Sequence, residues 1–358
     1  MSFSDLYDNP LTSEVTIGDS GSKLPAQAVA DLETITVLDD LTAPGMFTLE
    51  LNNWDGAAEA PPWSDDSNTF FPGQKVAISL GYVGQQTAVS VIEGEITSLE
   101  PVFRPTPANM VVRGYDLRHR LMRGRKTQTF TEMKDSDIAD KILGAANLAK
   151  TITKTAVAHP YVLQHNQTDF AFLQERARRI GFELAIEGKT VLFRPRPIDK
   201  KEAITLKLGQ DLIEFTPRLT TMAQVSEVTV QGWDITKKEA ILGMAKIGKE
   251  TAVLGSTAGP KATNGAFGST VATYTSSPVF NQAEADQMAL GRFNEMALNY
   301  ISGEGICYGR PDLKAGTIVA IEGVGKKYSG LYYIASVKHI WNKERGYRLY
   351  FTYKRNAN

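Results

Sequence analysis

The sequence has little cysteine, little charge imbalance and no long apolar run. Cys307 is the single cysteine, which excludes a disulfide within the chain and a metal cluster held by several thiolates. The 39 basic and 40 acidic residues give a formal net charge of −1, so no overall attraction to nucleic acid or to an anionic membrane is expected. No run of about 20 apolar residues is present, and no membrane insertion is expected. The N-terminus lacks a basic stretch followed by an apolar one, so we expect no signal peptide.

Motifs for catalysis, metal binding and cofactor binding are equally scarce. The histidines are His119, His159, His165 and His339, and no two have the i, i+4 spacing of a helical metal site. The glycine-rich run 303–309 follows a predicted helix, whereas a dinucleotide loop opens a helix after a strand. The sequence therefore predicts no catalytic residue, no metal ligand and no cofactor.

A short design occurs twice in the chain. Residues 73–78 and 316–321 both read Gly-x-x-Val-Ala-Ile, which is typical of a turn that leads into a strand. In each copy two further strands follow, with glycine near their starts. Coincidence is the alternative, because glycine before an alternating strand is common. We interpret the pair as two related small β-barrels. The predicted turn residues are Pro72, Gly73, Gly94, Gly114, Gly316 and Gly330.

Changes in hydrophobic period divide the chain into domains. The fold class that we predict is mainly β with α/β insertions, because alternating strands dominate both ends and helical periodicity appears between them. The predicted division is a first β-barrel over 1–117, a small α/β domain over 118–202, a second β-barrel over 203–235 and 301–358, and a loop or arm with a long helix over 236–300.

The α/β domain carries two helix signals. Asp135 or Ser136 can cap a first helix. A second helix is expected to begin at 168–169 and to end before Gly181, where a C-terminal cap is favoured. The predicted core of this second helix includes Phe172, Leu173 and Ile180.

The segment 236–300 contains one clear helix. Asn281 and Glu284 resemble a capping box that begins a helix over about 281–300. Residues 250–280 are rich in small residues and lack periodicity, so they are predicted to form a long loop or an extended arm.

Two groups of charged residues leave alternatives open. Glu93 and Glu95 alternate on one strand and are candidates for the acid of a cell-wall glycan hydrolase, although a general acid needs an apolar pocket. Basic residues that follow the first β-barrel are candidates for a protein-docking patch, a nucleic-acid-binding patch or a solvated linker. No aromatic or helical recognition pattern accompanies them, which disfavours nucleic acid. These basic residues are Arg118, Arg120, Arg123 and Arg125.

Several motifs follow one another in a defined order along the chain. They are Pro44 to Leu51, Phe71-Pro72-Gly73, Gly94-Glu95-Ile96, Gly114-Tyr115-Asp116, Gln167 to Gly181, and Ser329 to Tyr333. This order resembles that of a known family, the baseplate central hub proteins of contractile tails. The family includes phage late control D proteins, phage tail hubs and the N-terminal hub portion of VgrG spikes.

The resemblance implies a structural protein and not an enzyme. It implies a homotrimer whose two tube domains per chain form a ring with pseudo-six-fold symmetry. Such a ring adapts a hexameric tail-tube (initiator) protein to a trimeric spike protein, here a separate chain, and contacts other baseplate proteins without binding specific nucleic acid. Assembly is expected in the bacterial cytoplasm, and the final location is the baseplate of a virion tail or an injection particle. Relatives with a fused spike continue from the C-terminal end, so Tyr347, Tyr353 and Arg355 are expected at the spike-facing end.

Overall fold

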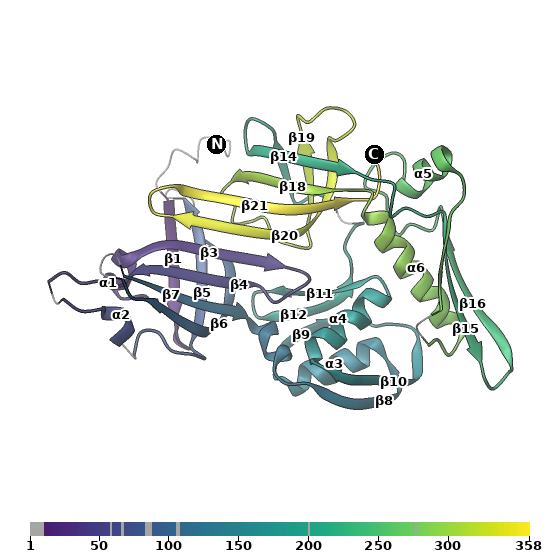
Figure 1. Cartoon of the computed structure of the whole chain (residues 1–358), viewed down its shortest axis with the longest axis horizontal. Helices are drawn as coiled ribbons and strands as arrows, with labels where there is room; N and C mark the ends of the chain where they lie inside the picture. The colour runs from purple at the N-terminus through teal and green to yellow at the C-terminus, as the bar shows by residue number, and fades with distance from the viewer. Residues whose placement is uncertain are drawn as a thin grey trace.

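The computed structural model describes residues 11–57, 59–65, 68–82, 88–104, 108–199, 201–275 and 278–358. Within these residues, thirteen strands form one large sheet, and three small sheets accompany it. In Figure 1 the large sheet occupies the left and the top, a small α/β unit lies below it, and a further sheet with a long helix lies at the right. This arrangement confirms the predicted mainly β fold class with α/β insertions.

The first β unit contains most of the N-terminal third of the chain. Its strands alternate between buried apolar and more exposed residues, as in Ile35 and Val37, which are fully buried. Its strands are β1 (Leu11–Ile17), β2 (Ser22–Lys23), β3 (Leu32–Asp40), β4 (Met46–Asn52), β5 (Lys75–Tyr82), β6 (Val89–Val102) and β7 (Asn109–Asp116). Two short helices, α1 (Ala26–Asp31) and α2 (Pro62–Asp65), lie in its connections.

The second β unit is assembled from two separated stretches of the chain. Its core contains aromatic residues such as Tyr332 and Tyr353, whose rings lie 5.0 Å apart. Its strands are β13 (Ile204–Lys207), β14 (Leu212–Leu219), β18 (Ile301–Tyr308), β19 (Ile318–Glu322), β20 (Gly330–Asn342) and β21 (Gly346–Arg355).

The two β units share one strand order. Across the first unit the order is β1-β5-β6-β7-β4-β3, and across the second it is β13-β19-β20-β21-β18-β14. When the two-residue β2 is left out and the other six strands of each unit are numbered by position along the chain, both orders read 1-4-5-6-3-2. One difference is that β1 pairs with β5 antiparallel whereas β13 pairs with β19 parallel. The repeat seen in six residues of sequence therefore extends over six strands.

The two units are joined directly by strand pairing. The first part of β20 pairs with β19, and its second part pairs antiparallel with β3, from Ser336 opposite Asp40 to Asn342 opposite Thr34. This junction makes the thirteen strands continuous.

The α/β unit covers residues 117–199. Thr168 accepts a hydrogen bond from the N–H of Ala171 and begins α4, and Gly181 follows the helix at φ +75°, which confirms both predicted boundaries. The first predicted cap is wrong by one residue or two, because Lys134 precedes α3 and Asp135 lies within it. Its elements are a 3-10 turn (Leu117–Met122), β8 (Lys126–Lys134), α3 (Asp135–Ala145), β9 (Ala149–Ile152), β10 (Ala158–Gln167), α4 (Asp169–Arg179), β11 (Phe182–Glu187) and β12 (Thr190–Pro195).

A helix-backed sheet replaces much of the predicted arm. Its strands are β15 (Glu227–Asp234), β16 (Glu239–Lys246) and β17 (Val271–Tyr274), with α5 (Gly259–Phe267) before β17 and α6 (Gln282–Leu298) after it. β15, which was predicted in the second barrel, pairs instead with β16 and β17. β16 was not predicted as a strand because it carries small or apolar residues on both faces, so apolar and polar residues do not alternate. Ile241 is buried and its neighbour Leu242 is exposed. Asn281 caps α6 as predicted, accepting from the N–H of Glu284 at 2.9 Å.

Candidate functional site

The strongest candidate for function is the repeated turn at the start of β5 and β19. In the first copy the N–H of Gly73 donates to the carbonyl of Ile96 at 2.8 Å. In the second the N–H of Gly316 donates to the carbonyl of Ile334 at 2.9 Å. Both glycines have positive φ, +90° and +77°, which other residues rarely adopt. Ile96 and Ile334 therefore occupy equivalent positions.

Two irregularities in strand pairing are also repeated. Where β6 pairs with β7, the register shifts between Ile96 and Ser98, and where β20 pairs with β21 it shifts between Ile334 and Ser336. A second shift lies between Leu32 and Thr34 on β3, and its counterpart lies between Leu212 and Glu214 on β14. Bulges are position-specific features of a sheet. The two units therefore share register as well as strand order.

Two of the predicted turn glycines are needed for another reason. Gly94 and Gly114 lie inside β6 and β7 and not in turns, which corrects that prediction. A Cβ on Gly94 would lie 2.1 Å from the carbonyl oxygen of Tyr115, and one on Gly114 would lie 2.2 Å from the ring of Phe47. Glycine here permits close packing. Pro72 does lie in a turn, and Gly330 has φ +135° at the start of β20.

Arg118 is not part of a surface patch, which corrects another prediction. Its side chain is completely buried and forms a 2.8 Å ion pair with Asp116. It also donates to the carbonyls of Leu184 and Asp40, each at 3.0 Å. Arg118 therefore connects β11 of the α/β unit to the C-terminal ends of β3 and β7. The acid two residues earlier was the available sequence signal.

The other predicted docking residues lie nearer to the surface. Arg120 binds Glu95 and keeps 37% of its side chain exposed. Arg123 and Arg125 are exposed, and Arg125 donates to the carbonyl of Asn166 at 2.8 Å. A docking role for these three arginines stays a prediction.

Glu95, one of the two candidate acids of a hydrolase, has the opposite electrostatics from a general acid. Burial alone would raise the pKa of Glu95, but hydrogen bonds and charge from Arg120 and His119 lower the pKa below its usual value. Glu93 forms a 3.2 Å ion pair with Lys189. A general acid needs a raised pKa, so Glu95 is arranged to stay ionised.

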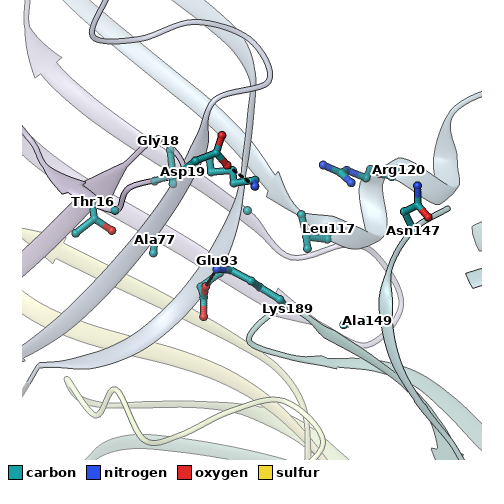
Figure 2. A pocket seen from close by; sticks show the side chains of 14 residues that line it. Thr16, Gly18, Asp19, Ala77, Glu93, Leu117, Arg120, Asn147, Ala149 and Lys189 are labelled. Atoms are coloured by element: carbon teal, nitrogen blue, oxygen red, sulfur yellow. Dashed lines mark hydrogen bonds and ion pairs between the residues drawn. The ribbon is translucent and has the colours of Figure 1, made fainter. Parts of the chain in front are cut away.

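Glu93 lines a cavity of about 450 Å³ between the first β unit and the α/β unit. Figure 2 shows the carboxylate of Glu93 beside Lys189, with Arg120 across the cavity. Lys75 also lines the cavity and forms an ion pair with Asp19. These three cations have carboxylate partners, since Arg120 binds Glu95. The cavity therefore offers little unmatched charge for an ionic substrate.

The predicted spike-facing residues point inward. Tyr347, Tyr353 and Arg355 are each at most 4% exposed. The Tyr347 hydroxyl lies 2.7 Å from Nδ1 of His339, and Arg355 donates to the carbonyl of Leu254 at 3.0 Å. These side chains stabilise the core of the C-terminal strands, and the orientation of this end of the chain towards a spike stays a prediction.

The predicted helix core is largely confirmed. Phe172 and Leu173 are buried, and Ile180 is half-buried against the same cluster. The Phe172 ring stacks on Phe130 at 5.7 Å. Cys307 is buried, and burial raises the pKa of its thiol.

Several buried polar contacts between units were not predicted from the sequence. The Tyr333 hydroxyl on β20 donates to Glu183 on β11. His159 on β10 lies 3.1 Å from both Asp135 on α3 and Glu284 on α6. These contacts hold the α/β unit against the second β unit and the helix-backed sheet. Each partner is far away in sequence, so no local pattern marks them.

Comparison with known protein families gives one match along most of the chain. The model of the family described as the Alg8 N-terminal domain matches residues 11–343. No curated protein sequence matches the chain. Within the described residues, no helix has the length and apolar character required to cross a membrane.

Solved structures of tail proteins have the same fold. The prophage MuSo2 43 kDa tail protein from Shewanella oneidensis is 14% identical, with a TM-score of 0.68 over 96% of this chain and 99% of that chain. The tail protein from Neisseria meningitidis MC58 is 13% identical, with a TM-score of 0.69 over 97% of each chain. The E. coli c3393 protein is a component of the type VI secretion system with structural similarity to the bacteriophage T4 tail proteins gp27 and gp5. It is 14% identical, with a TM-score of 0.56 over 92% of this chain and 74% of that chain.

Proposed function

This chain belongs to the Alg8 N-terminal domain family, and we propose that it is the structural hub of a tail baseplate or contractile injection machine. In this role three copies form a ring around a central channel. The ring adapts a hexameric tail-tube protein to a trimeric spike supplied as a separate chain, and it contacts other baseplate proteins.

The observation that carries this proposal is the repetition of one six-strand unit within the chain. The two units share strand order, the glycine turn and two register shifts. A three-fold assembly can match a six-fold partner only if each subunit carries two similar surfaces. Two equivalent units in one chain meet that requirement, so a trimer would present six.

The fold relationships support this setting. Similar structures include tail proteins of two prophage or bacterial sources and a type VI secretion component. Injection machines and phage tails share tubes and spikes, so a hub role fits either. The lowered pKa of Glu95 also favours a structural role over hydrolysis. Arg120 and His119 keep this carboxylate ionised, whereas a general acid must hold its proton.

Sedimentation or native mass spectrometry tests the proposal. The chain has a mass of 39.2 kDa, and we expect complexes with three copies, alone or with the spike protein. Stable monomers at all concentrations, with and without spike and tube proteins, would contradict it.

A further inference from the structure

Two strand edges of the large sheet are left open in the part of the chain that the structure describes. Residues 98–102 of β6 pair with β7 on one side, whereas β5 pairs only with the earlier part of β6. β14 pairs with β18 on one side, and no strand formed by the described residues runs along its other side. Open edges invite pairing with another chain.

The counterparts of these two edges in the repeated unit, β20 and β3, are already paired with each other within the chain. β6 corresponds to β20, because Ile96 and Ile334 make the same turn contacts. β3 corresponds to β14, because Leu32 and Leu212 precede the same register shift. The strand pairings support the same correspondence. Paired residues lead from β6 through β7 and β4 to β3, and in the same register from β20 through β21 and β18 to β14. The internal junction of β20 with β3 is therefore the counterpart of a junction of β6 with β14.

We propose that β6 of one copy pairs antiparallel with β14 of the next copy, in the register of the internal junction. This inference rests on the proposed trimeric function and identifies the surface that would close the ring. The register follows by replacing each residue of the internal junction with its counterpart. The opposed residues are Ser98 and Thr220, Leu99 and Leu219, Glu100 and Arg218, Pro101 and Pro217, and Val102 and Thr216.

Charge complementarity supports this register independently of the repeat. Glu100 falls opposite Arg218, and two positions beyond Val102 the same register brings Arg104 opposite Glu214. Opposite charges on facing strand positions stabilise a pairing, and like charges destabilise it. The counterparts of these pairs in the internal junction are Lys338 with Leu38 and Asn342 with Thr34. Neither internal pair is ionic, so the charge complementarity between β6 and β14 is not inherited from the internal junction.

The apolar and proline positions agree with the same alignment. Phe103 is 67% exposed, and the register places it opposite Phe215, a partner that would cover it. Pro101 falls opposite Pro217, so the two positions without an N–H coincide and interrupt the ladder at one place. Prolines at strand edges also hinder incorrect pairing.

Cysteine cross-linking tests the register with a matched control. The variants Ser98→Cys/Thr220→Cys and Val102→Cys/Thr216→Cys place both cysteines at opposed positions. The recombined variants Ser98→Cys/Thr216→Cys and Val102→Cys/Thr220→Cys use the same four positions but displace them by four residues, about 13 Å. A disulfide requires Cα atoms within about 7 Å. The native Cys307 is buried and should not interfere.

Electrophoresis without reductant after mild oxidation gives the result. We expect the opposed variants to form linked species of two and three chains, and the displaced variants to link at least tenfold less. Trimers by native mass spectrometry without this preference would overturn the register and leave the hub proposal standing. Monomers by mass for every variant and the parent would overturn both.

A charge exchange provides a second readout. Glu100→Arg and Arg218→Glu should each weaken assembly by about two- to fivefold per junction, and the double exchange should restore it. Glu100 also binds Arg113 within its own chain, so the thermal stability of each variant is measured in parallel. Absence of restoration in a double variant that folds normally would count against the predicted pair.

Discussion

The carboxylate of Asp39 accepts a 2.9 Å hydrogen bond from the backbone N–H of Ala315, a residue 276 positions later in the chain. Asp39 lies on β3 opposite Val337 of β20, so this contact is part of the junction between the two β units. Burial is the main cause that raises its pKa to about 6, despite the lowering effects of Ala315 and Arg118.

Replacing Asp39 with Asn should change how stability depends on pH. The folded pKa of about 6 lies above the ordinary value of 3.8. Between these values the folded state holds the proton more tightly than the unfolded state, so stability falls as pH rises through this window. Asp39→Asn should remove this fall and raise the free energy of unfolding at pH 7 by about 1–3 kcal/mol. Urea denaturation between pH 4 and 7 measures it.

The neighbouring Asp40→Asn is the matched control, since Asp39 remains and the fall with pH should persist. Equal slopes for the parent and Asp39→Asn would contradict the assignment.

His339 predicts the opposite dependence on pH. Burial lowers its pKa to about 3 from 6.5. Between pH 6.5 and pH 3 the imidazole is therefore protonated in the unfolded state but neutral in the folded state. Stability is therefore lost as pH falls towards 3, by up to about 1.4 kcal/mol per pH unit. His339→Gln should reduce this acid sensitivity, although it also disturbs the contact with Tyr347.

The comparison for His339 uses His165→Gln, because His165 is exposed. Chemical denaturation at several values between pH 4 and 7 should give a smaller slope for His339→Gln alone. A slope that changes as much in His165→Gln would refute the explanation.

Glycine substitutions should separate close packing from backbone strain. Gly94→Ala places a Cβ 2.1 Å from a backbone oxygen, so the strands must separate at a cost of about 3 kcal/mol or more. At Gly73 a Cβ meets no atom within 4 Å, and Gly73→Ala should cost only about 1 kcal/mol for its positive φ. Thermal denaturation of both variants measures the difference. Equal losses would contradict it.

The core of the α/β unit should respond strongly to truncation of one helix residue. Phe172 is 2% exposed and stacks on Phe130, so Phe172→Ala should lower the free energy of unfolding by about 3–5 kcal/mol. Leu163→Ala is the control, because Leu163 on β10 is 43% exposed and should lose less than about 1 kcal/mol. Similar losses in both variants would show that α4 packs differently.

Local patterns in the sequence were sufficient for much of the fold. The alternation around Ile35 and Val37, the Thr168 cap and the Gly181 stop are each set by neighbouring residues, and the structure agrees with them. The short repeat at Gly73 and Gly316 correctly indicated duplicated strands, because a positive φ must be met by glycine in both copies.

Long-range features were not predictable in this way. Arg118 looks in sequence like the exposed Arg123 and Arg125. Its burial depends on the carbonyls of Leu184 and Asp40, which only the fold brings near. β16 was missed because residues such as Leu242 and Met244 are apolar yet exposed. The register shifts and the β20–β3 junction involve pairing partners, which a single strand does not specify.

Electron cryomicroscopy of the assembled protein, without imposed symmetry, would show how the two β units of each chain are arranged. We expect a ring of three chains in which both β units of every chain lie at the same radius and height, with successive units related by about 60°. A ring built from only one of the two units, or units at different radii, would contradict the claim that the repeat in this chain matches three-fold to six-fold symmetry.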